Sequence, residues 1–95
     1  MSEFIQIMRF RTDHIDEVQK LVRQYDADVV GRSTVTSEVS GRDLDSGEYV
    51  VIVRFPSKAA AEMNNALPET GALANAIGAL CTGGLSFSNV EVLDP

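Results

Sequence analysis

The stretch "YVVIVRFPSKAA", residues 49–60, decides the fold of this chain, because it joins an apolar strand to a helix within a few residues. Tyr, Val and Ile fill both faces of its first half, a composition typical of a central strand that is covered on both sides. Pro56 lacks the N–H that a strand ladder needs and disfavours helix at the residue before it, so the strand is predicted to end at Phe55. Ser57 is then placed to cap a helix that begins in the alanines.

Three further strands are predicted from alternating patterns, over residues 3–12, 33–40 and 85–93. The first carries apolar residues on both faces, whereas the segment 33–40 alternates polar and β-branched residues as an edge strand does. The turn-rich segment 41–48 joins that edge strand to the central one as a hairpin. In the last strand the alternation slips near Asn89, which predicts a β-bulge there.

Two helical regions are predicted, the second of them broken by a proline. Thr12 or Asp13 caps the first helix, and Gly31 ends it. The second region starts at Ser57 and is interrupted at Pro68, because the residue before a proline disfavours helix. The apolar positions of the first helix are Ile15, Val18, Leu21, Val22, Tyr25 and Val29. Those of the second region are Ala59, Met63 and Leu67 before the break and Leu73, Ile77 and Leu80 after it.

The predicted element order, β-α-β-β-α-β, gives a ferredoxin-like α+β fold with a four-stranded antiparallel sheet and both helical regions on one face. Residues 1–95 are predicted to form one such domain. The residues assigned to the face beneath the helices are Ile5, Ile7, Val50 and Ile52. The opposite face then carries a large apolar patch, made of Phe4, Met8, Phe10, Tyr49, Val51, Val53 and Phe55. A second copy of the sheet across a two-fold axis covers such a patch, so we predict a homodimeric α/β barrel that encloses a chamber.

Charge and composition argue against several classes of partner. The net charge of −6, from 14 acidic and 8 basic residues, repels phosphate backbones, so no nucleic-acid partner is predicted. The apolar stretches are too short to span a membrane, and the N-terminal residues do not resemble a secretion signal. The single cysteine, Cys81, cannot form an internal disulfide, and no glycosylation acceptor occurs. A cytoplasmic protein with no membrane partner is predicted.

The residues that usually carry chemistry are sparse. Histidine, cysteine and acidic residues do not cluster with metal-ligand spacing, and no glycine-rich loop follows a strand, so no metal and no cofactor are predicted. The acidic segment 43–48 is interpreted as a hairpin turn, because it lacks the complete ligand pattern of a calcium loop. His14, the only histidine, is expected on the surface, and Cys81 is expected to act as a small buried apolar residue.

The element order and the stretch "YVVIVRFPSKAAAEMN" resemble the dimeric α/β-barrel superfamily, most closely the antibiotic biosynthesis monooxygenase (ABM) domains and small uncharacterised actinobacterial relatives. In those relatives the third strand commonly ends in an aromatic residue, followed by a serine at the helix start and often by a histidine on the helix. Phe55, Ser57 and Asn64 stand near these positions. In the haem-degrading branch an asparagine, a tryptophan and a histidine carry the activity. Here Met8, Phe55 and Asn64 stand near those positions and the chain has no Trp, so haem degradation is not predicted.

The dimer chamber is the remaining candidate for a functional site, because an apolar lining with few polar groups is typical of small-molecule sites. Two functions stay open. One is an ABM-like, cofactor-independent oxygenase acting on an aromatic or polyketide-like substrate, in which neutral polar groups stabilise a carbanion or phenolate. The other is a non-catalytic ligand-binding, sensing or assembly module that uses the same chamber. The predicted lining consists of Phe4, Gln6, Met8, Phe10, Tyr49, Val51, Phe55 and Asn64.

Overall fold

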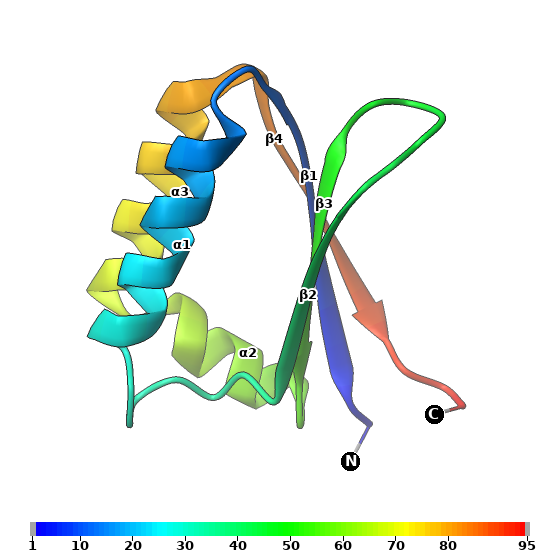
Figure 1. Cartoon of the computed structure of the whole chain (residues 1–95). Helices are drawn as coiled ribbons and strands as arrows, with labels where there is room; N and C mark the ends of the chain where they lie inside the picture. Colours follow the sequence, from blue (N-terminus) through cyan, green and yellow to red (C-terminus); the bar gives the residue numbers. More distant parts are fainter. Residues whose placement is uncertain (1, 95) are drawn as a thin grey trace.

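The computed structural model of the chain describes residues 2–94. All strand pairs are antiparallel, in the order β2-β3-β1-β4. Figure 1 shows the three helices on one side of this sheet. The predicted ferredoxin-like α+β fold is therefore confirmed. The elements are β1 (Phe4–Thr12), α1 (Ile15–Asp28), β2 (Ser37–Arg42), β3 (Tyr49–Phe55), α2 (Lys58–Asn65), α3 (Pro68–Leu80) and β4 (Cys81–Glu91).

Pro56 and Pro68 set element boundaries as predicted. β3 ends at Phe55, and the hydroxyl of Ser57 accepts a hydrogen bond from the backbone N–H of Ala60 at 3.1 Å, which caps α2. Pro68 occupies the first turn of α3, where its missing N–H costs nothing, and Leu67 before it is extended. None of the helices within residues 2–94 is both long and apolar enough to cross a membrane.

The strand boundaries that differ most from the prediction are the starts of β2 and β4. β2 begins at Ser37 rather than at residue 33, because the Thr34 hydroxyl donates a hydrogen bond to the carbonyl of Ala60 at 2.6 Å and ties this segment to α2. β4 begins at Cys81 rather than at residue 85 and runs on directly from α3.

The bulge in β4 lies at Gly83 and Gly84, and the bulge predicted near Asn89 is wrong. The pairing register between β1 and β4 shifts between Phe10 and Arg11, opposite the two glycines. Their φ values of 84° and 86° lie in the left-handed region, which glycine adopts without steric cost. Asn89 instead sits in regular register opposite Gln6.

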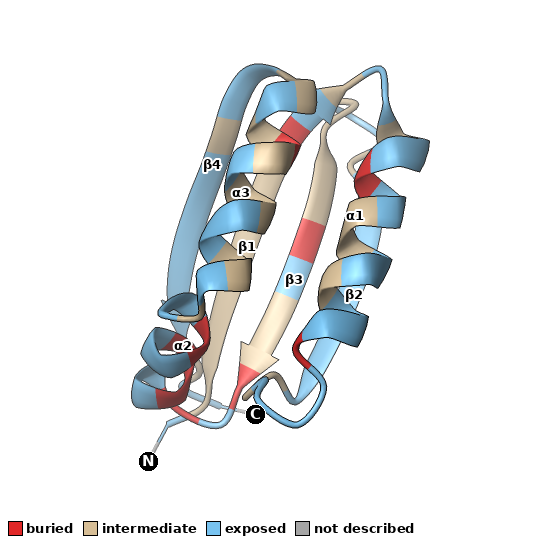
Figure 2. Ribbon diagram, turned by 90° about the vertical axis from the view of Figure 1, so that its left-hand side faces the viewer, coloured by how far each residue is buried: buried red, intermediate tan, exposed pale blue. Residues whose placement is uncertain are grey.

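The face of the sheet that the helices cover is the one predicted to be open. Phe10 and Val51 pack with Val18 of α1 and Ile77 of α3 in one core cluster, and Phe55 packs with the alanines of α2 in a second. Figure 2 shows buried segments of β3 lying between α1 and α3. The predicted assignment of the two faces was therefore reversed. The residues that it placed on the bare side, Phe4, Met8, Phe10, Tyr49, Val51, Val53 and Phe55, all pack in these two clusters.

The open face of the sheet carries the other alternating set. It holds the four residues predicted to lie beneath the helices, Ile5, Ile7, Val50 and Ile52. Val39 pairs with Ile52 and Val90 with Ile5, so these two residues share the same face. We call these six residues the open-face patch.

Ion pairs border the open-face patch. Arg9 lies 3.4 Å from Asp43, and Arg54 lies 3.0 Å from Glu3. Both arginines share the alternation of Ile5 and Ile52. A face that carries charges at its ends is harder to desolvate beneath helices, so these arginines were a signal for the open side.

α2 buries a different side from the one predicted. Ala60, Ala61 and Asn64 are buried, whereas Met63, expected in the core, is 65% exposed. A prediction from hydrophobicity alone passes over Asn64, because its burial depends on hydrogen-bond partners from other elements. In α1 and α3 the predicted apolar positions face the core, with Val18 and Ile77 fully buried.

Candidate functional site

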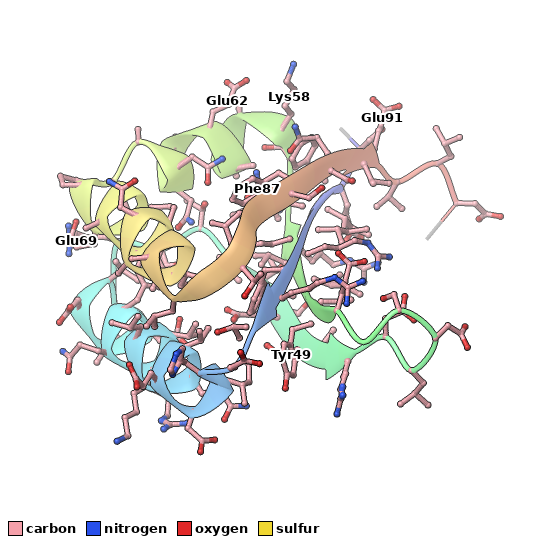
Figure 3. All side chains as sticks on the ribbon, turned by 90° about the horizontal axis from the view of Figure 1, so that it is seen from above. Tyr49, Lys58, Glu62, Glu69, Phe87 and Glu91 are labelled. Atoms are coloured by element: carbon pink, nitrogen blue, oxygen red, sulfur yellow. The ribbon has the colours of Figure 1, made fainter. Side chains whose placement is uncertain are left out.

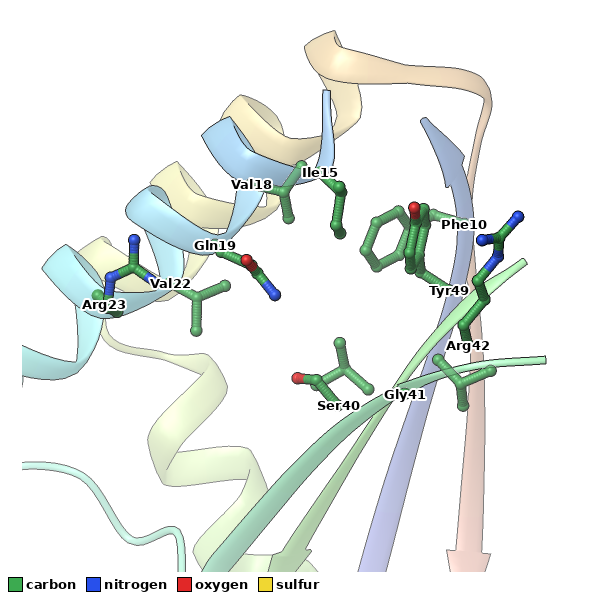
Figure 4. Close-up of a pocket in the computed structure, with 12 residues that line it drawn as sticks. Phe10, Ile15, Val18, Gln19, Val22, Arg23, Ser40, Gly41, Arg42 and Tyr49 are labelled. Atoms are coloured by element: carbon green, nitrogen blue, oxygen red, sulfur yellow. The ribbon is translucent and has the colours of Figure 1, made fainter. Parts of the chain in front are cut away.

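An apolar cleft lies between α1 and the covered face of the sheet, with a volume of about 370 Å³ (Figure 4). Phe10, Val18 and Val51 form its apolar floor and walls. Five α1 residues recur at helical spacing and therefore lie on the side of the helix that faces the cleft. They are Ile15, Val18, Gln19, Val22 and Arg23. The polar groups at its edge are Gln19 and Arg23 from α1 and Ser40 and Arg42 from β2. We call this region the arginine hollow.

A second, smaller hollow of about 100 Å³ adjoins the first, since both are lined by Val22 and Val51. Strand residues Gln6, Met8, Val51, Val53 and Phe55 form its sheet side. The helices contribute Tyr25, Asn64, Asn65, Thr70, Leu73, Ala74 and Ile77, and Val35, Glu38 and Phe87 complete the lining. We call this region the asparagine hollow.

A hydrogen-bonded cluster fixes the side chain of Asn64, which is only 5% exposed. Its amide nitrogen donates to the Tyr25 hydroxyl at 3.2 Å, and its amide oxygen accepts from the Ser33 hydroxyl at 3.3 Å. The Thr70 hydroxyl donates to the backbone carbonyl of Asn64 at 2.7 Å. Thr70 has thereby used its only proton, so the 2.7 Å contact between the two hydroxyls has Tyr25 as donor. Every hydroxyl proton of the cluster has a defined direction.

Glu38 is the acidic group of the asparagine hollow. It pairs with Val53 in the β2–β3 register and therefore shares the covered face. Partial burial raises the pKa of the Glu38 carboxyl, and the negative charge of Asp26 on α1 raises it further. Burial also raises the pKa of Asp26. A carboxylate with a raised pKa is a stronger base than one in water.

Most of the predicted site residues come together, but not where they were expected. Gln6, Met8, Val51, Phe55 and Asn64 line the asparagine hollow, and Phe10, Tyr49 and Val51 line the arginine hollow. The two hollows lie between the sheet and the helices of one chain. They are not the chamber between two sheets that the sequence analysis proposed.

Two predicted lining residues have other roles in the structure. Phe4 lines neither hollow and packs on Phe55, with ring centroids 6.5 Å apart. The amide of Gln6 donates to Asn89 across the β1–β4 pair at 3.3 Å, which occupies part of its hydrogen-bonding capacity.

Several polar lining residues were missed by sequence reasoning. Tyr25 was recognised only as a core position of the first helix, and Thr70 carried no signal of its own. Glu38 and Arg42 share one side of β2, opposite Val53 and Tyr49 of β3. With the covered face assigned correctly, the alternation of side chains along β2 would have placed Glu38 and Arg42 on that face.

His14 and Cys81, the other side chains with potential chemistry, line neither hollow. His14 is exposed beside Glu17, at 3.7 Å. Cys81 packs at the edge of the core, and burial raises the pKa of its thiol, which disfavours the reactive thiolate. Within residues 2–94, no three His, Cys, Asp or Glu side chains come together in a group that could hold a metal ion.

Comparisons with known proteins bear on the fold. No family model and no curated protein matches the sequence. SnoaB, a cofactor-independent oxygenase from Streptomyces nogalater, matches in structure with a TM-score of 0.80 and 18% identity, over 100% of this chain and 97% of SnoaB. An antibiotic biosynthesis monooxygenase matches with a TM-score of 0.75 and 18% identity, over 96% of this chain and 99% of that protein. The chain has the ABM fold.

The same ABM-like fold occurs in a dimeric ferredoxin-like protein of unknown function from Jannaschia sp. CCS1. That structure matches with a TM-score of 0.79 and 16% identity, over 95% of this chain and 99% of that protein. Identities at this level establish the fold, and one fold serves many activities. The function of this chain therefore has to be argued from its own cleft.

Proposed function

We propose that this chain binds a flat aromatic or polyketide-like molecule in one helix–sheet cleft and oxidises it with O₂ without a cofactor. The arginine hollow and the asparagine hollow together form that cleft. The observation that carries the proposal is the buried, hydrogen-bonded amide of Asn64 at one end of an apolar cleft. An apolar lining with a few fixed polar groups is typical of small-molecule sites, and a volume of about 370 Å³ lies within their usual range. SnoaB, which shares the fold, is a cofactor-independent oxygenase.

The lining residues supply the groups that such a reaction needs. In the proposed reaction, Glu38 removes a proton from an acidic C–H or phenol of the substrate, and the resulting anion transfers electrons to O₂. A ring CH₂ and one O₂ become a ring C=O and one water, so no external reductant is required. The Asn64 amide has two hydrogens, of which the bond to Tyr25 uses one, and the second stabilises the substrate oxyanion.

Oxygen uptake with 1,8-dihydroxyanthrone as the probe substrate tests this proposal. The protein is expected to raise uptake above the rate without protein. Glu38→Gln should lower the protein-dependent rate about 100-fold, a typical loss for a general base. Glu62→Gln is the matched control, because Glu62 is exposed on α2 and points away from the cleft (Figure 3). Equal rates for Glu38→Gln and the control would contradict the catalytic role of Glu38.

A non-catalytic binding or sensing protein is the second candidate. It is favoured by the closed hydrogen bonding around Asn64 and by the Gln6–Asn89 bond, since polar groups that satisfy one another are less free to act on a substrate. This candidate would be supported if 1,8-dihydroxyanthrone binds, as measured by quenching of its fluorescence, but the protein causes no O₂ uptake.

We further propose that the chain forms a homodimer through the open-face patch. Its occupant is a second copy of the sheet, because a two-fold contact pairs one apolar patch with itself. Val39 is 59% exposed and Ile52 is 37% exposed, which is unfavourable for apolar residues unless a partner covers them. The Jannaschia protein with this fold is described as dimeric. The proposed dimer differs from the one expected from the sequence in the residues that it buries.

The proposal retains a cytoplasmic location and the absence of a nucleic-acid partner. The first is supported by the single, half-buried Cys81, and the second by the net charge of −6.

A further inference from the structure

The hydrogen bonds around Asn64 form a closed ring that starts and ends on this one residue. Its side-chain nitrogen lies 3.2 Å from the Tyr25 hydroxyl, and that hydroxyl lies 2.7 Å from the Thr70 hydroxyl. The Thr70 hydroxyl in turn lies 2.7 Å from the backbone carbonyl of Asn64. The three residues belong to three helices, and Figure 1 shows the end of α1 beside the junction of α2 and α3. The ring therefore depends on the packing of these helices.

Only one bond of this ring has a direction that its own atoms determine. A backbone carbonyl accepts hydrogen bonds and cannot donate them, so the bond between Thr70 and the Asn64 carbonyl has Thr70 as donor. A threonine hydroxyl has a single proton, so Thr70 must accept from Tyr25. Tyr25 then has no proton left for Asn64, and its hydroxyl can only accept from the amide nitrogen.

This order of donors selects one of the two orientations of the Asn64 amide. In the structure the nitrogen faces Tyr25, and the oxygen accepts from the Ser33 hydroxyl at 3.3 Å. Ser33 does not make the choice, because a serine hydroxyl can donate or accept. A flipped amide would place its oxygen against a Tyr25 hydroxyl whose proton is already used. Two acceptors would then face each other around a side chain that is only 5% exposed, which is unfavourable.

We propose that Thr70 is a positioning residue, which acts on Asn64 through Tyr25 and ensures that the amide offers a hydrogen-bond donor to the asparagine hollow. Tyr25 holds one amide hydrogen, and the planar amide group then fixes the direction of the second. This inference rests on the proposed function, because the second hydrogen is the one assigned to the substrate oxyanion. The orientation itself is a property of the chain without substrate.

Nuclear Overhauser effects (NOEs) from the side-chain amide hydrogens of Asn64 test this orientation without any substrate. In the wild type these hydrogens should give a stronger NOE to the Tyr25 ring than to the Ser33 methylene group. Thr70→Val removes the hydroxyl and keeps a similar shape, so Tyr25 can donate its proton to the amide oxygen. The amide should then flip and give the stronger NOE to Ser33. Thr70→Ser keeps a hydroxyl and should retain the wild-type pattern.

The O₂ uptake assay with 1,8-dihydroxyanthrone tests the consequence for catalysis. Thr70→Val should lower kcat about 100-fold and change KM by less than about threefold, as expected when one oxyanion donor is lost. Thr70→Ser should restore most of the rate. Adding Thr70→Val to Tyr25→Phe should cause no further loss of kcat, because the effect of Thr70 passes through the Tyr25 hydroxyl.

Thr36→Val is the matched control. The Thr36 hydroxyl also donates to a backbone carbonyl, that of Arg54 at 3.0 Å, but Thr36 lines neither hollow. This variant should leave both the NOE pattern and kcat unchanged, and a loss of kcat equal to that of Thr70→Val would overturn the inference.

Three NOE results would overturn the role of Thr70 whatever the activity. They are a stronger wild-type NOE to Ser33, which requires no variant, an unchanged pattern in Thr70→Val, and a reversed pattern in Thr70→Ser. A wild-type chain with the expected NOEs but no O₂ uptake would overturn the proposed oxygenase and leave the orientation of Asn64 by Thr70 in place.

Discussion

The two faces of the central strands β1 and β3 both carry apolar residues but differ in what covers them. On the covered face, Phe10 and Phe55 are almost completely buried, at 2% and 1% exposure, against helices of the same chain. On the open face, Ile52 and Val39 remain substantially exposed. Aromatic residues dominate the covered face, whereas β-branched residues bordered by arginine ion pairs form the open one.

The alternation of apolar residues along a strand therefore predicts that a face is buried. It does not reveal whether helices of the same chain or a second sheet cover that face. Large rings on the covered face reach across to helices and leave hollows between them, which is where the candidate site lies. Flat β-branched residues suit packing against another sheet. Contacts on the covered face are required for folding, while those proposed for the open face depend on protein concentration.

The sharpest test of this comparison uses two neighbouring residues of β3. Val51→Glu places an unpaired charge in the core and should abolish folding, because the cost exceeds the stability of a small domain. Ile52→Glu should keep the fold and prevent dimer formation. Circular dichroism reports the fold and native mass spectrometry the assembly.

Met63→Glu is the control for that pair, because Met63 is exposed on α2 and lies outside the open-face patch. It should leave both fold and assembly unchanged. A wild-type monomer, or an Ile52→Glu variant that still forms dimers, would refute the role proposed for the open face.

The two faces should also differ, by a smaller effect, in how much a truncated side chain lowers the free energy of unfolding. In the Ile52→Glu background, where dissociation does not contribute, Phe55→Ala should lower the free energy of unfolding by about 3 to 5 kcal/mol. Val39→Ala, at an exposed position of the open face, should change it by only about 0.5 kcal/mol. Urea denaturation measures both. Similar losses for the two variants would mean that the open face is also packed within the monomer.

The smallest predicted effect concerns pH. Burial raises the pKa of Glu38 in the folded state, so ionised Glu38 destabilises the fold, and Glu38→Gln should be slightly more stable than wild type at pH 7. Backbone N–H groups of Ser46 and Asp45 lower the pKa of Asp43, which also pairs with Arg9, so Asp43→Asn should be less stable at pH 7. Both differences should disappear as the pH falls and the wild-type carboxyls become protonated.

Thermal unfolding at several pH values measures the two variants against wild type. Differences of the same sign at neutral pH would contradict the contrast between the two carboxyls. A Glu38→Gln variant that is stable also ensures that a loss of O₂ uptake is not caused by unfolding.

Local signals in the sequence predicted most of the secondary structure. Pro56, Ser57 and Pro68 act on their own backbone neighbourhood, so their effects can be read without knowing the fold. The bulge at Gly83 and Gly84 was not predicted, because two glycines directly after a helix permit a helix stop and a bulge equally well. The start of β2 depends on a bond between Thr34 and α2, which no local pattern contains.

The candidate site was predicted in part. Residues of one strand parity face the same way, so Met8, Phe10, Tyr49 and Val51 were grouped correctly even though their partner was not. Tyr25 and Thr70 lie 45 positions apart in the sequence and meet only because α1 packs beside α3. Their hydrogen bonds to Asn64 are a product of packing and leave no periodic trace in the sequence.

The sequence by itself determined the order of the elements, the ends of β3 and α2, and which strand residues share a face. Only the tertiary structure decided which face the helices cover, because both faces are apolar and the hydrophobic effect does not distinguish them by direction. That choice depends on the handedness of the connections that lead from β1 to α1 and from β3 to α2. It placed the cleft, with Asn64 at one end and Arg42 at the other, inside a single chain.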